Sequence, residues 1–295
     1  MMKKRMLQID VFSDTPLLGN PAAVIFDADD IPAAIMQRIA REMNLSETVF
    51  LVSPTGEADY RARIFTPANE LPFAGHPTIA AAHAWCQDRD IQSRTLTQEC
   101  GIGLVPIRID SGLYTMTQPT PQFREAAVSK ADLASMLALP LEALADSPHQ
   151  IVSTGVPWLL LELRDTAALG ALRPDLGKID QVCQALGAAG LTVFADKGHT
   201  SEPRLRLRTF APGEGVAEDP VCGSGNGAVA AWIATQRDAT VAGSYLAEQG
   251  VEMGRRGLVH AAWETRQDGL EITVGGMACI VLRGELDLGN LNPTV

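Results

Sequence analysis

The sequence predicts an α+β protein of two similar, pseudo-symmetric domains, each a mostly antiparallel sheet with one long helix laid against it. Three observations favour this fold. The 295 residues are about twice the usual domain length of roughly 150. The composition, with 46% apolar and 20% charged residues, is that of a globular chain with enough apolar material for a full core. The same order of strand, loop and helix patterns also occurs twice.

An internal repeat is the strongest of these signals. The segment Arg61–Pro67, with the sequence RARIFTP, aligns with Arg206–Pro212, RLRTFAP, at an offset of 145 residues. The loop Glu70–His76 then aligns with Glu218–Ser224 at an offset of 148 residues. Several ordered matches with slowly drifting offsets indicate an internal duplication, although two similar units that arose by convergence would give a weaker version of the same pattern.

In the first half, turn residues separate short β-rich runs. A helix is predicted to begin at the cap residue Asp30 and to end at Asn44, because apolar residues between them follow an i, i+4 spacing. A second, alanine-rich helix follows Gly75 and is predicted over residues 78–85. The predicted strands, in chain order, are residues 8–12, 22–26, 47–52, 60–65, 104–109 and 113–117.

The second half repeats this programme after an extra helix that begins at the capping-box residue Ser129. Two prolines break the pattern in residues 116–126, which we take as the domain linker. The predicted domains are therefore 1–118 and 119–284, and the tail 285–295 is a candidate to complete the first. The predicted strands and helices of the second half are residues 151–153, 158–163, 180–186 (helical, ended by Gly187), 191–194, 204–210 and 228–235 (helical).

Charge and cysteine content exclude several classes of function. With 24 Lys and Arg against 35 Asp and Glu, the net charge is −11, opposite to that of a general nucleic-acid or anionic-membrane binder. No apolar run approaches the roughly 18 residues of a membrane span, and no signal peptide is predicted after the basic residues 1–5. The five cysteines are scattered without a C-x-x-C pair, which indicates free thiols in a reducing cytoplasm.

Both halves carry the pattern Glu-x-Pro-x-x-Gly-[His/Ser] at the start of a helix. Unpaired backbone N–H groups and the helix dipole can hold an anion there, and Gly75 and Gly223 would let it approach closely. The alternative is that both loops are only tight strand-to-helix turns. No Gly-Lys-[Ser/Thr] follows, so neither is a P-loop. His76 and His83 lack a third ligand nearby, so we predict no metal site and favour a packed or polar role for His83.

These residues together resemble the PhzF-like family, named for phenazine biosynthesis, which has the diaminopimelate epimerase-like fold. The match spans most of the chain in the expected order, but it is not specific for one substrate. The segments that carry it are Asp10–Phe12, Gly19–Pro21, Ser46–Thr48, Phe65–Pro67, Gly75–Thr78 and Glu218–Ser224.

The resemblance implies two domains, each a sheet wrapped around a central helix, an active-site cleft between them, no cofactor and a homodimer. It also implies isomerase chemistry on a small carboxylated substrate, as in the movement of a proton between ring carbons of trans-2,3-dihydro-3-hydroxyanthranilate. The family's general acid/base glutamate falls on Glu47. Its other site residues fall on His76, Asp219 and Ser224, which contact substrate, and on Gly75 and Gly223, which hold an anion.

The position of Glu47 agrees with that role. It follows a helix stop and precedes the apolar run Val49–Val52, and a carboxyl beside apolar walls can have its pKa raised by desolvation. A carboxyl tuned in this way takes and returns protons near neutral pH. The matched position in the second half is Leu191, so only one half supplies the carboxyl. The alternative is an ordinary solvated surface glutamate.

Cys222 departs from the pattern of the related racemases, which use one cysteine at each helix start. The first copy has Ala74 at that place, so two-cysteine racemisation is excluded. The helix N-terminus is expected to be able to lower the pKa of Cys222. Three interpretations remain: a small packing residue, a thiol that contacts substrate, or an acid/base partner of Glu47. The sequence therefore predicts a cofactor-independent PhzF-like isomerase, with an amino-acid epimerase or a non-catalytic carboxylate-binding protein as alternatives.

Overall fold

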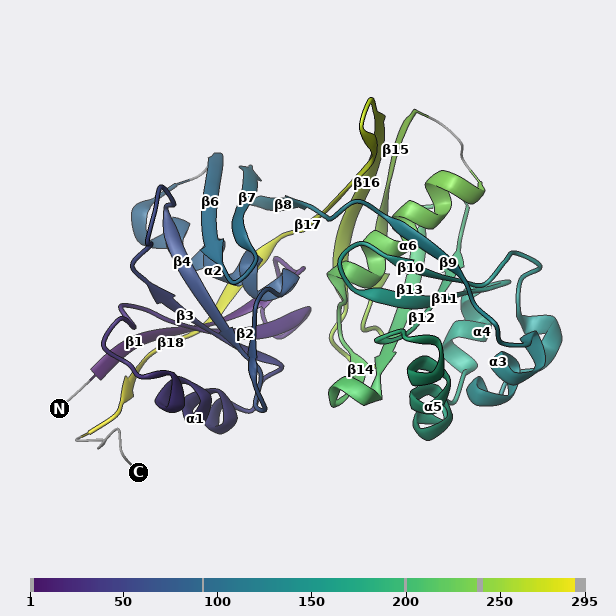
Figure 1. Ribbon diagram of the computed structural model, residues 1–295, viewed down its shortest axis with the longest axis horizontal. Coiled ribbons are helices and arrows are strands. Elements are labelled where there is room, and N and C mark those ends of the chain that lie inside the picture. Colours follow the sequence, from purple (N-terminus) through teal and green to yellow (C-terminus); the bar gives the residue numbers. More distant parts are fainter. Residues whose placement is uncertain (1–2, 92, 199–200, 238–240, 290–295) are drawn as a thin grey trace. The chain divides into compact units, whose positions relative to one another are not determined.

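The computed structural model describes residues 3–91, 93–198, 201–237 and 241–289, and the chain divides into two compact units (Figure 1). The first unit comprises Met1–Met116 together with the segment from Gly276 onward, and the second comprises Thr117–Gly275. The predicted division lay two residues later, at 118, and placed the returning C-terminal segment at 285–295. That segment begins earlier, and residues 290–295 lie outside the described part of the chain.

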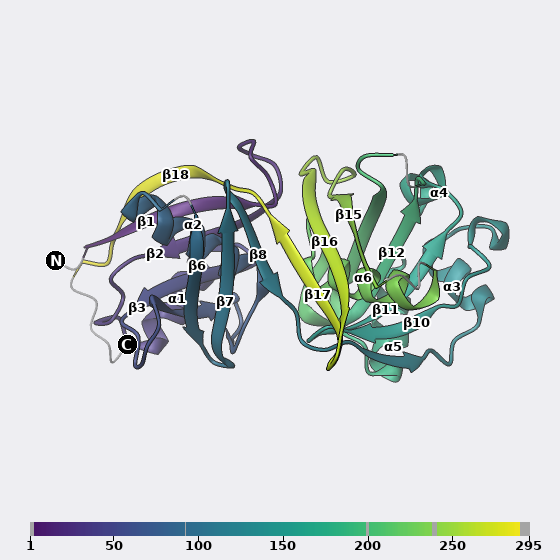
Figure 2. The same cartoon turned by 90° about the horizontal axis from the view of Figure 1, so that it is seen from above.

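The first unit is built from strands that surround one long helix. Its sheet contains β1 and β2 antiparallel, β2 and β3 parallel, β3 and β4 antiparallel, and β4 and β6 parallel. The last strand of the chain, β18, runs antiparallel to β1 along its whole length, as Figure 2 shows. The elements are β1 (Lys3–Val11), β2 (Asn20–Ile25), α1 (Ala33–Met43), β3 (Glu47–Val52), β4 (Tyr60–Phe65), β5 (Glu70–Leu71), α2 (Gly75–Arg89), β6 (Arg94–Cys100), β7 (Gly103–Asp110), β8 (Leu113–Thr117) and β18 (Ala278–Asp287).

The second unit repeats that strand order. Strands β10 and β11 are antiparallel, β11 and β12 parallel, β12 and β13 antiparallel, and β13 and β15 parallel. Strand β9 runs antiparallel to β10, just as β18 runs antiparallel to β1 in the first unit. The elements are β9 (Gln122–Glu125), α3 (Lys130–Leu137), β10 (Gln150–Ser153), β11 (Pro157–Leu163), α4 (Thr166–Ala171), α5 (Leu176–Leu186), β12 (Gly190–Asp196), β13 (Leu205–Ala211), β14 (Val216–Asp219), α6 (Gly223–Gln236), β15 (Ala242–Gln249), β16 (Gly257–Arg266) and β17 (Gly269–Gly276). The matching topology confirms the predicted pair of similar α+β domains.

The two long helices, α2 and α6, are buried on nearly every side. In α2 residues 76–84 are all buried, and in α6 residues 225–234 are all buried. Both sequences are rich in alanine, and a helix that is small and apolar all round can lie close to strands on several sides. α2 contacts β1, β2, β3, β4, β6 and β18 within its unit, and α6 contacts β10, β11, β15 and β16 within its own. Each is therefore the central helix of a wrapped sheet.

The structure corrects several predicted boundaries. Helix α1 is capped by Pro32 without a side-chain hydrogen bond, and Asp30 instead forms an ion pair with Lys4. The end of α1 at Asn44 is confirmed, since Asn44 adopts the left-handed conformation (φ 50°). The segment 116–126 is wrong as a plain linker, because β9 forms there and pairs with β10.

Helix starts elsewhere follow their side-chain caps. The predicted cap Ser129 is confirmed, because its hydroxyl accepts a hydrogen bond from the Asp132 amide. Helix α5 begins before the predicted residue 180, since the carboxylate of Asp175 caps it, and its predicted end at Gly187 is confirmed (φ 62°). The strands β6 and β15–β17 were not predicted. In β6 and β15 burial alternates along the strand, but polar residues such as Gln98 and Gln249 occupy buried positions, so the sequence shows no clear apolar alternation.

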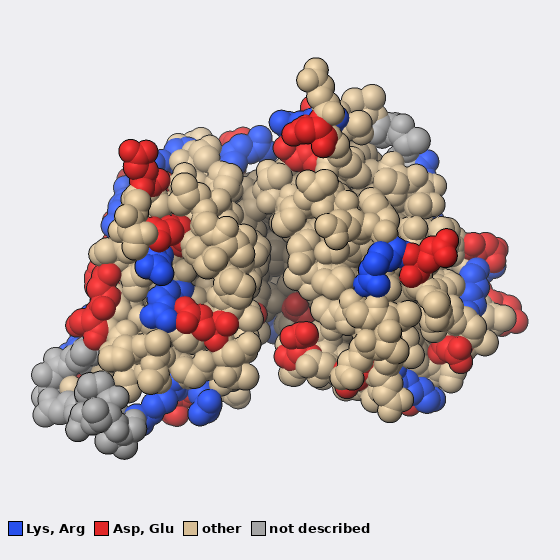
Figure 3. Space-filling model, viewed as in Figure 1, with Lys and Arg blue, Asp and Glu red and all other residues tan. Residues whose placement is uncertain are grey.

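None of the helices in the described part of the chain is long and apolar enough to span a membrane. On the face shown in Figure 3, basic and acidic side chains are interspersed over each unit rather than gathered by sign. No basic stripe of the kind that a nucleic-acid backbone needs is visible on this face, and the net charge of the full sequence is −11.

Candidate active site

Glu47 is the first residue of β3 and lies beside Ala22 of the parallel strand β2. The strand that follows is buried, and the Glu47 side chain itself is only 15% exposed. Burial raises the pKa of this carboxyl from 4.5 to about 7, and the neighbouring Ser46 hydroxyl opposes the shift only in part. The carboxyl can therefore exist in both protonation states near neutral pH.

His76 meets Glu47 from the first turn of α2. Its Nε2 atom lies 3.2 Å from Oε2 of Glu47, and the imidazole is 9% exposed. The cap residue Ala74 provides no side-chain hydrogen bond to the helix start, and a Cβ added at Gly75 would come no closer than 3.9 Å to a neighbouring atom. The first unit thus brings together Glu47, Gly75 and His76, and a Cβ at the glycine would meet the methyl group of Met116 at ordinary contact distance.

The second unit brings together Asp219, Cys222, Gly223 and Ser224. Asp219 ends β14, and its Oδ1 accepts a hydrogen bond from the Val221 amide at 3.1 Å. Gly223 and Ser224 are the first two residues of α6, and Cys222 is its cap. All four residues therefore lie on one short stretch that passes from an edge strand into the central helix.

Gln249, which is fully buried at the end of β15, holds that stretch in place. Its Nε2 donates to the carbonyl of Asp219 at 3.0 Å, and its Oε1 accepts from the Cys222 amide at 3.2 Å and from Asn226 Nδ2 at 3.1 Å. Sequence reasoning missed Gln249 and Asn226. The sequence signal for Gln249 was weak. A polar side chain at the end of a strand predicts no role until its hydrogen-bond partners are known, and those of Gln249 are more than twenty residues away.

Cys222 is a buried cap residue rather than an activated thiol. Its Sγ accepts a hydrogen bond from the Gly225 amide at 3.3 Å and lies 3.5 Å from Oγ of Ser224. Burial, with a smaller effect from the nearby Asp219 carboxylate, raises the pKa of the thiol. The expectation of a lowered pKa is wrong, because a helix N-terminus contributes at most about 2 kcal/mol and full desolvation of a thiolate costs more.

His83 is confirmed as a packed histidine. Its Nδ1 lies 3.1 Å from the hydroxyl of Tyr114, and burial lowers the pKa of the imidazole to about 4. Within the described ranges, no group of three or more His, Cys, Asp and Glu residues is arranged to hold a metal ion.

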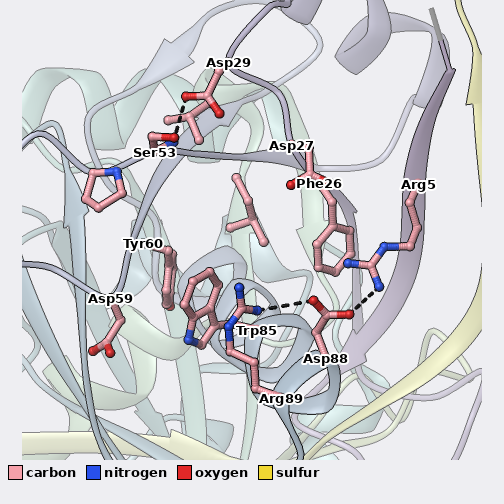
Figure 4. A pocket seen from close by; sticks show the side chains of 13 residues that line it. Arg5, Phe26, Asp27, Asp29, Ser53, Asp59, Tyr60, Trp85, Asp88 and Arg89 are labelled. Carbon is pink, nitrogen blue, oxygen red and sulfur yellow. Dashed lines mark hydrogen bonds and ion pairs between the residues drawn. The ribbon is translucent and has the colours of Figure 1, made fainter.

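The first unit contains a surface pocket of about 270 Å³ that includes none of these site residues (Figure 4). Asp88 accepts hydrogen bonds from both Arg5 and Arg89 at its rim. The two guanidinium groups lie over the rings of Phe26 and Trp85 respectively. These contacts join β1 to the last turn of α2, so the pocket walls are explained by packing.

A duplicated ion pair precedes each helix start. Arg63 on β4 binds Glu70 through two parallel hydrogen bonds of 2.7 Å, and Arg208 on β13 binds Glu218 in the same way at 2.8 Å. The first pair is partly exposed, whereas the Arg208 side chain is only 7% exposed. Each pair ties a central strand to the short strand that leads into the candidate site.

The model of the PhzC-PhzF family, described as phenazine biosynthesis-like protein, matches residues 9–284. The chain belongs to this family. The likeness covers between 97% and 100% of the length of each of the three related chains described next.

Two relatives and one solved structure illustrate the family. The chain is 36% identical to trans-2,3-dihydro-3-hydroxyanthranilate isomerase of Pseudomonas chlororaphis over 95% of its own length and 98% of the relative's. It is also 36% identical to antisense-enhancing sequence 1 of Schizosaccharomyces pombe, over 94% and 97%. A PhzF-family structure from Bacillus anthracis is 28% identical, covers 98% of this chain and 100% of its own, and has a TM-score of 0.90. The chain is thus a PhzF-type isomerase.

The fold reaches beyond this family. A hydroxyproline epimerase from Agrobacterium vitis is 14% identical, with a TM-score of 0.61 over 99% of this chain and 93% of its own. At that identity the likeness supports the fold alone, a pair of similar α+β domains of the epimerase type.

Proposed function

We propose that this protein is a cofactor-independent isomerase that moves a proton between two carbons of a small carboxylated substrate, with Glu47 as general acid/base. The observation that carries the proposal is a carboxyl whose pKa lies at about 7, held 3.2 Å from an imidazole nitrogen of His76. A general base is most effective when its pKa lies near the working pH, because it must be deprotonated to accept the proton and acidic enough to return it.

The proposed reaction needs only one proton and no oxidant. The Glu47 carboxylate removes a proton from a carbon next to a double bond, and the electron pair of the broken C–H bond moves into the carbon framework as the double bond migrates. The resulting carboxylic acid then returns the proton to a second carbon. We propose trans-2,3-dihydro-3-hydroxyanthranilate as the first substrate to test, because the relative from Pseudomonas chlororaphis is named for its isomerisation.

The remaining site residues are assigned to binding. His76 orients the Glu47 carboxyl and, with Asp219, contacts the amino or hydroxyl groups of the substrate. Ser224 and the backbone at Gly75 and Gly223 hold its carboxylate, which fits helix starts whose dipoles favour a negative charge. The chain is also proposed to act as a homodimer, which light scattering tests by a mass of twice 31.5 kDa.

Substitution of Glu47 tests the assignment. We expect Glu47→Gln to reduce solvent-deuterium incorporation into the substrate by about 10²–10⁴-fold, the usual contribution of a general acid/base, while substrate binding persists. Glu70→Gln is a matched control, since that glutamate is exposed and lies outside the site. Deuterium uptake is measured by mass spectrometry. Uptake that survives in Glu47→Gln at the wild-type rate refutes the role of Glu47.

Two other functions predict different outcomes. An amino-acid epimerase that uses Glu47 and Cys222 would exchange a proton at a chiral Cα and would lose activity in Cys222→Ala, but the raised pKa of the Cys222 thiol disfavours it. A non-catalytic carboxylate-binding protein would be stabilised by small carboxylic acids and would show no deuterium uptake with any of them. A screen of cyclic and acyclic amino and hydroxy acids separates the three.

A further inference from the structure

Trp158, on β11, bonds directly to a proposed substrate-binding residue. Its indole Nε1–H donates a hydrogen bond to Oγ of Ser224 at 3.0 Å, and the side chain is only 5% exposed. An indole N–H can donate but never accept, so the direction of this bond is fixed. Ser224 Oγ is therefore an acceptor toward Trp158.

The sheet holds the Trp158 ring in one position. Trp158 pairs with Val152 on one side and with Gly190 on the other. A Cβ at Gly190 would stand 2.7 Å from Cζ3 of the indole, so the absence of a side chain there makes room for the ring. Thr154, the residue after β10, adds a long hydrogen bond of 3.5 Å to the backbone carbonyl of Ser224. The first turn of α6 is thus anchored to this sheet.

The bond decides what Ser224 can offer a ligand. A serine hydroxyl has one hydrogen to donate and two lone pairs to accept with, and Trp158 uses one of the lone pairs. The other nearby group, Sγ of Cys222 at 3.5 Å, is only a weak hydrogen-bond partner. The hydroxyl hydrogen is consequently available to a stronger acceptor, such as a carboxylate oxygen.

We infer that Trp158 is a positioning residue that holds the Ser224 hydroxyl as a hydrogen-bond donor toward an acceptor oxygen of the substrate. This inference rests on the proposed role of Ser224 in binding the substrate carboxylate. The first unit supports a functional rather than an architectural origin for the Trp158 side chain. The pair Leu159–Leu191 corresponds there to the pair Ala22–Glu47. The place of Trp158 is therefore taken in the first unit by Pro21, which has no side-chain donor.

A double-mutant cycle tests whether Trp158 acts through Ser224. The variants are Trp158→Phe, Ser224→Ala and the two combined. Trp232→Phe is the matched control, because Trp232 lies in α6, is 1% exposed, and its Nε1 has no hydrogen-bond partner within the described part of the chain. The readouts are KM and kcat for trans-2,3-dihydro-3-hydroxyanthranilate and Kd for its aromatic analogue 3-hydroxyanthranilate.

We expect Trp158→Phe to raise KM and Kd about 3- to 10-fold, the usual effect of one hydrogen bond, with kcat changed less than about twofold. Adding Ser224→Ala should leave no further effect of Trp158→Phe, and Trp232→Phe should leave Kd unchanged. An equal loss from Trp158→Phe in both backgrounds, or no loss in either, overturns the inference. An unchanged Kd in Ser224→Ala overturns both the binding role of Ser224 and this inference, whereas the Glu47→Gln test still stands.

A second measurement needs no ligand. The indole ¹⁵N–¹H signal of Trp158, identified by its absence from Trp158→Phe, should move in Ser224→Ala and stay in place in Cys222→Ala. If Trp158→Phe does not fold, benzothienylalanine at position 158 replaces the N–H by sulfur with nearly the same ring and supports the same binding measurement. A Trp158 signal that ignores Ser224→Ala contradicts the hydrogen bond itself.

Discussion

At the scale of single residues, burial sets the proton affinity of the Glu47 carboxyl. The pKa of its side chain is raised from 4.5 to about 7, so the folded state binds this proton more tightly than the unfolded state. Stability contributed in this way is fully present below pH 4.5 and is lost as pH rises through 7. The same burial that suits Glu47 to proton transfer therefore weakens the fold at neutral and higher pH.

This gives a prediction for Glu47→Gln, whose amide has no charge to desolvate. Relative to wild type, the free energy of unfolding of Glu47→Gln should increase between pH 4.5 and 8 by about 2–4 kcal/mol, from the size of the pKa shift. Urea unfolding at several pH values measures the difference. A flat line for Glu47→Gln would mean that burial does not raise the pKa of this carboxyl.

The burial of Cys222 predicts a thiol of low reactivity. Because burial raises the pKa of its thiol, we expect Cys222 to react with iodoacetamide at pH 8 at least tenfold more slowly than a free cysteine, whose pKa is about 8.5. We also expect Cys222→Ala to change kcat/KM by less than about tenfold, since the lost contacts are weak hydrogen bonds to sulfur. Peptide mapping after alkylation follows the label. Rapid labelling of Cys222 would revive the epimerase alternative.

Only some of the candidate site residues could be predicted from the sequence. The contrast between Glu47 and its counterpart Leu191 was predictable, because both lie in recognisable copies of one strand. The state of the Cys222 thiol was not, since a helix start and a buried pocket have opposite effects and only the packing decides between them. Trp158 and Gln249 were also missed, because each acts on a residue far away in the sequence.

At the scale of elements, the duplicated arginine–glutamate pairs allow one copy to serve as the control for the other. Removing Glu218 leaves the guanidinium of Arg208 buried without its partner, whereas Arg63 can turn toward water when Glu70 is removed. We expect Glu218→Ala to lower the free energy of unfolding by about 3–5 kcal/mol and Glu70→Ala by at most about 1 kcal/mol. Denaturant titration compares the two, and equal losses would contradict the difference in burial.

Most elements were predictable where local signals agreed. β3 and β4 have the predicted bounds, and α1 and α5 are terminated by Asn44 and Gly187 as predicted. The exceptions have non-local causes. β9 forms in a proline-containing segment because β10 offers it an edge. Helix α1 starts after Pro32, which has an extended conformation, and Asp30 pairs with Lys4 of β1 instead of capping the helix.

At the scale of the whole molecule, the chain is not divided into two consecutive halves. β18 pairs with every residue of β1, so the first unit depends on a strand from the far end of the sequence. The sequence suggested such a return but placed it at residue 285, because the repeat ends before β18 and provides no pattern to mark where the chain changes unit.

Removal of this strand has a predicted effect. A chain truncated after Gly275 should lose amide protection in β1 and β2 while β12 and β13 retain theirs, because the second unit is continuous from Thr117 to Gly275. Hydrogen exchange followed by mass spectrometry compares the truncated and full-length chains. Unchanged protection in β1 would mean that the first unit holds together without β18.

The returning strand also sets an order for biosynthesis. A ribosome releases residues 117–275 as a complete unit while the partner of β1 is still inside the exit tunnel or not yet made. Domains generally fold as they emerge, starting from the N-terminus. Here the second unit is ready first, and β1 gains its antiparallel partner only after β18 has been synthesised.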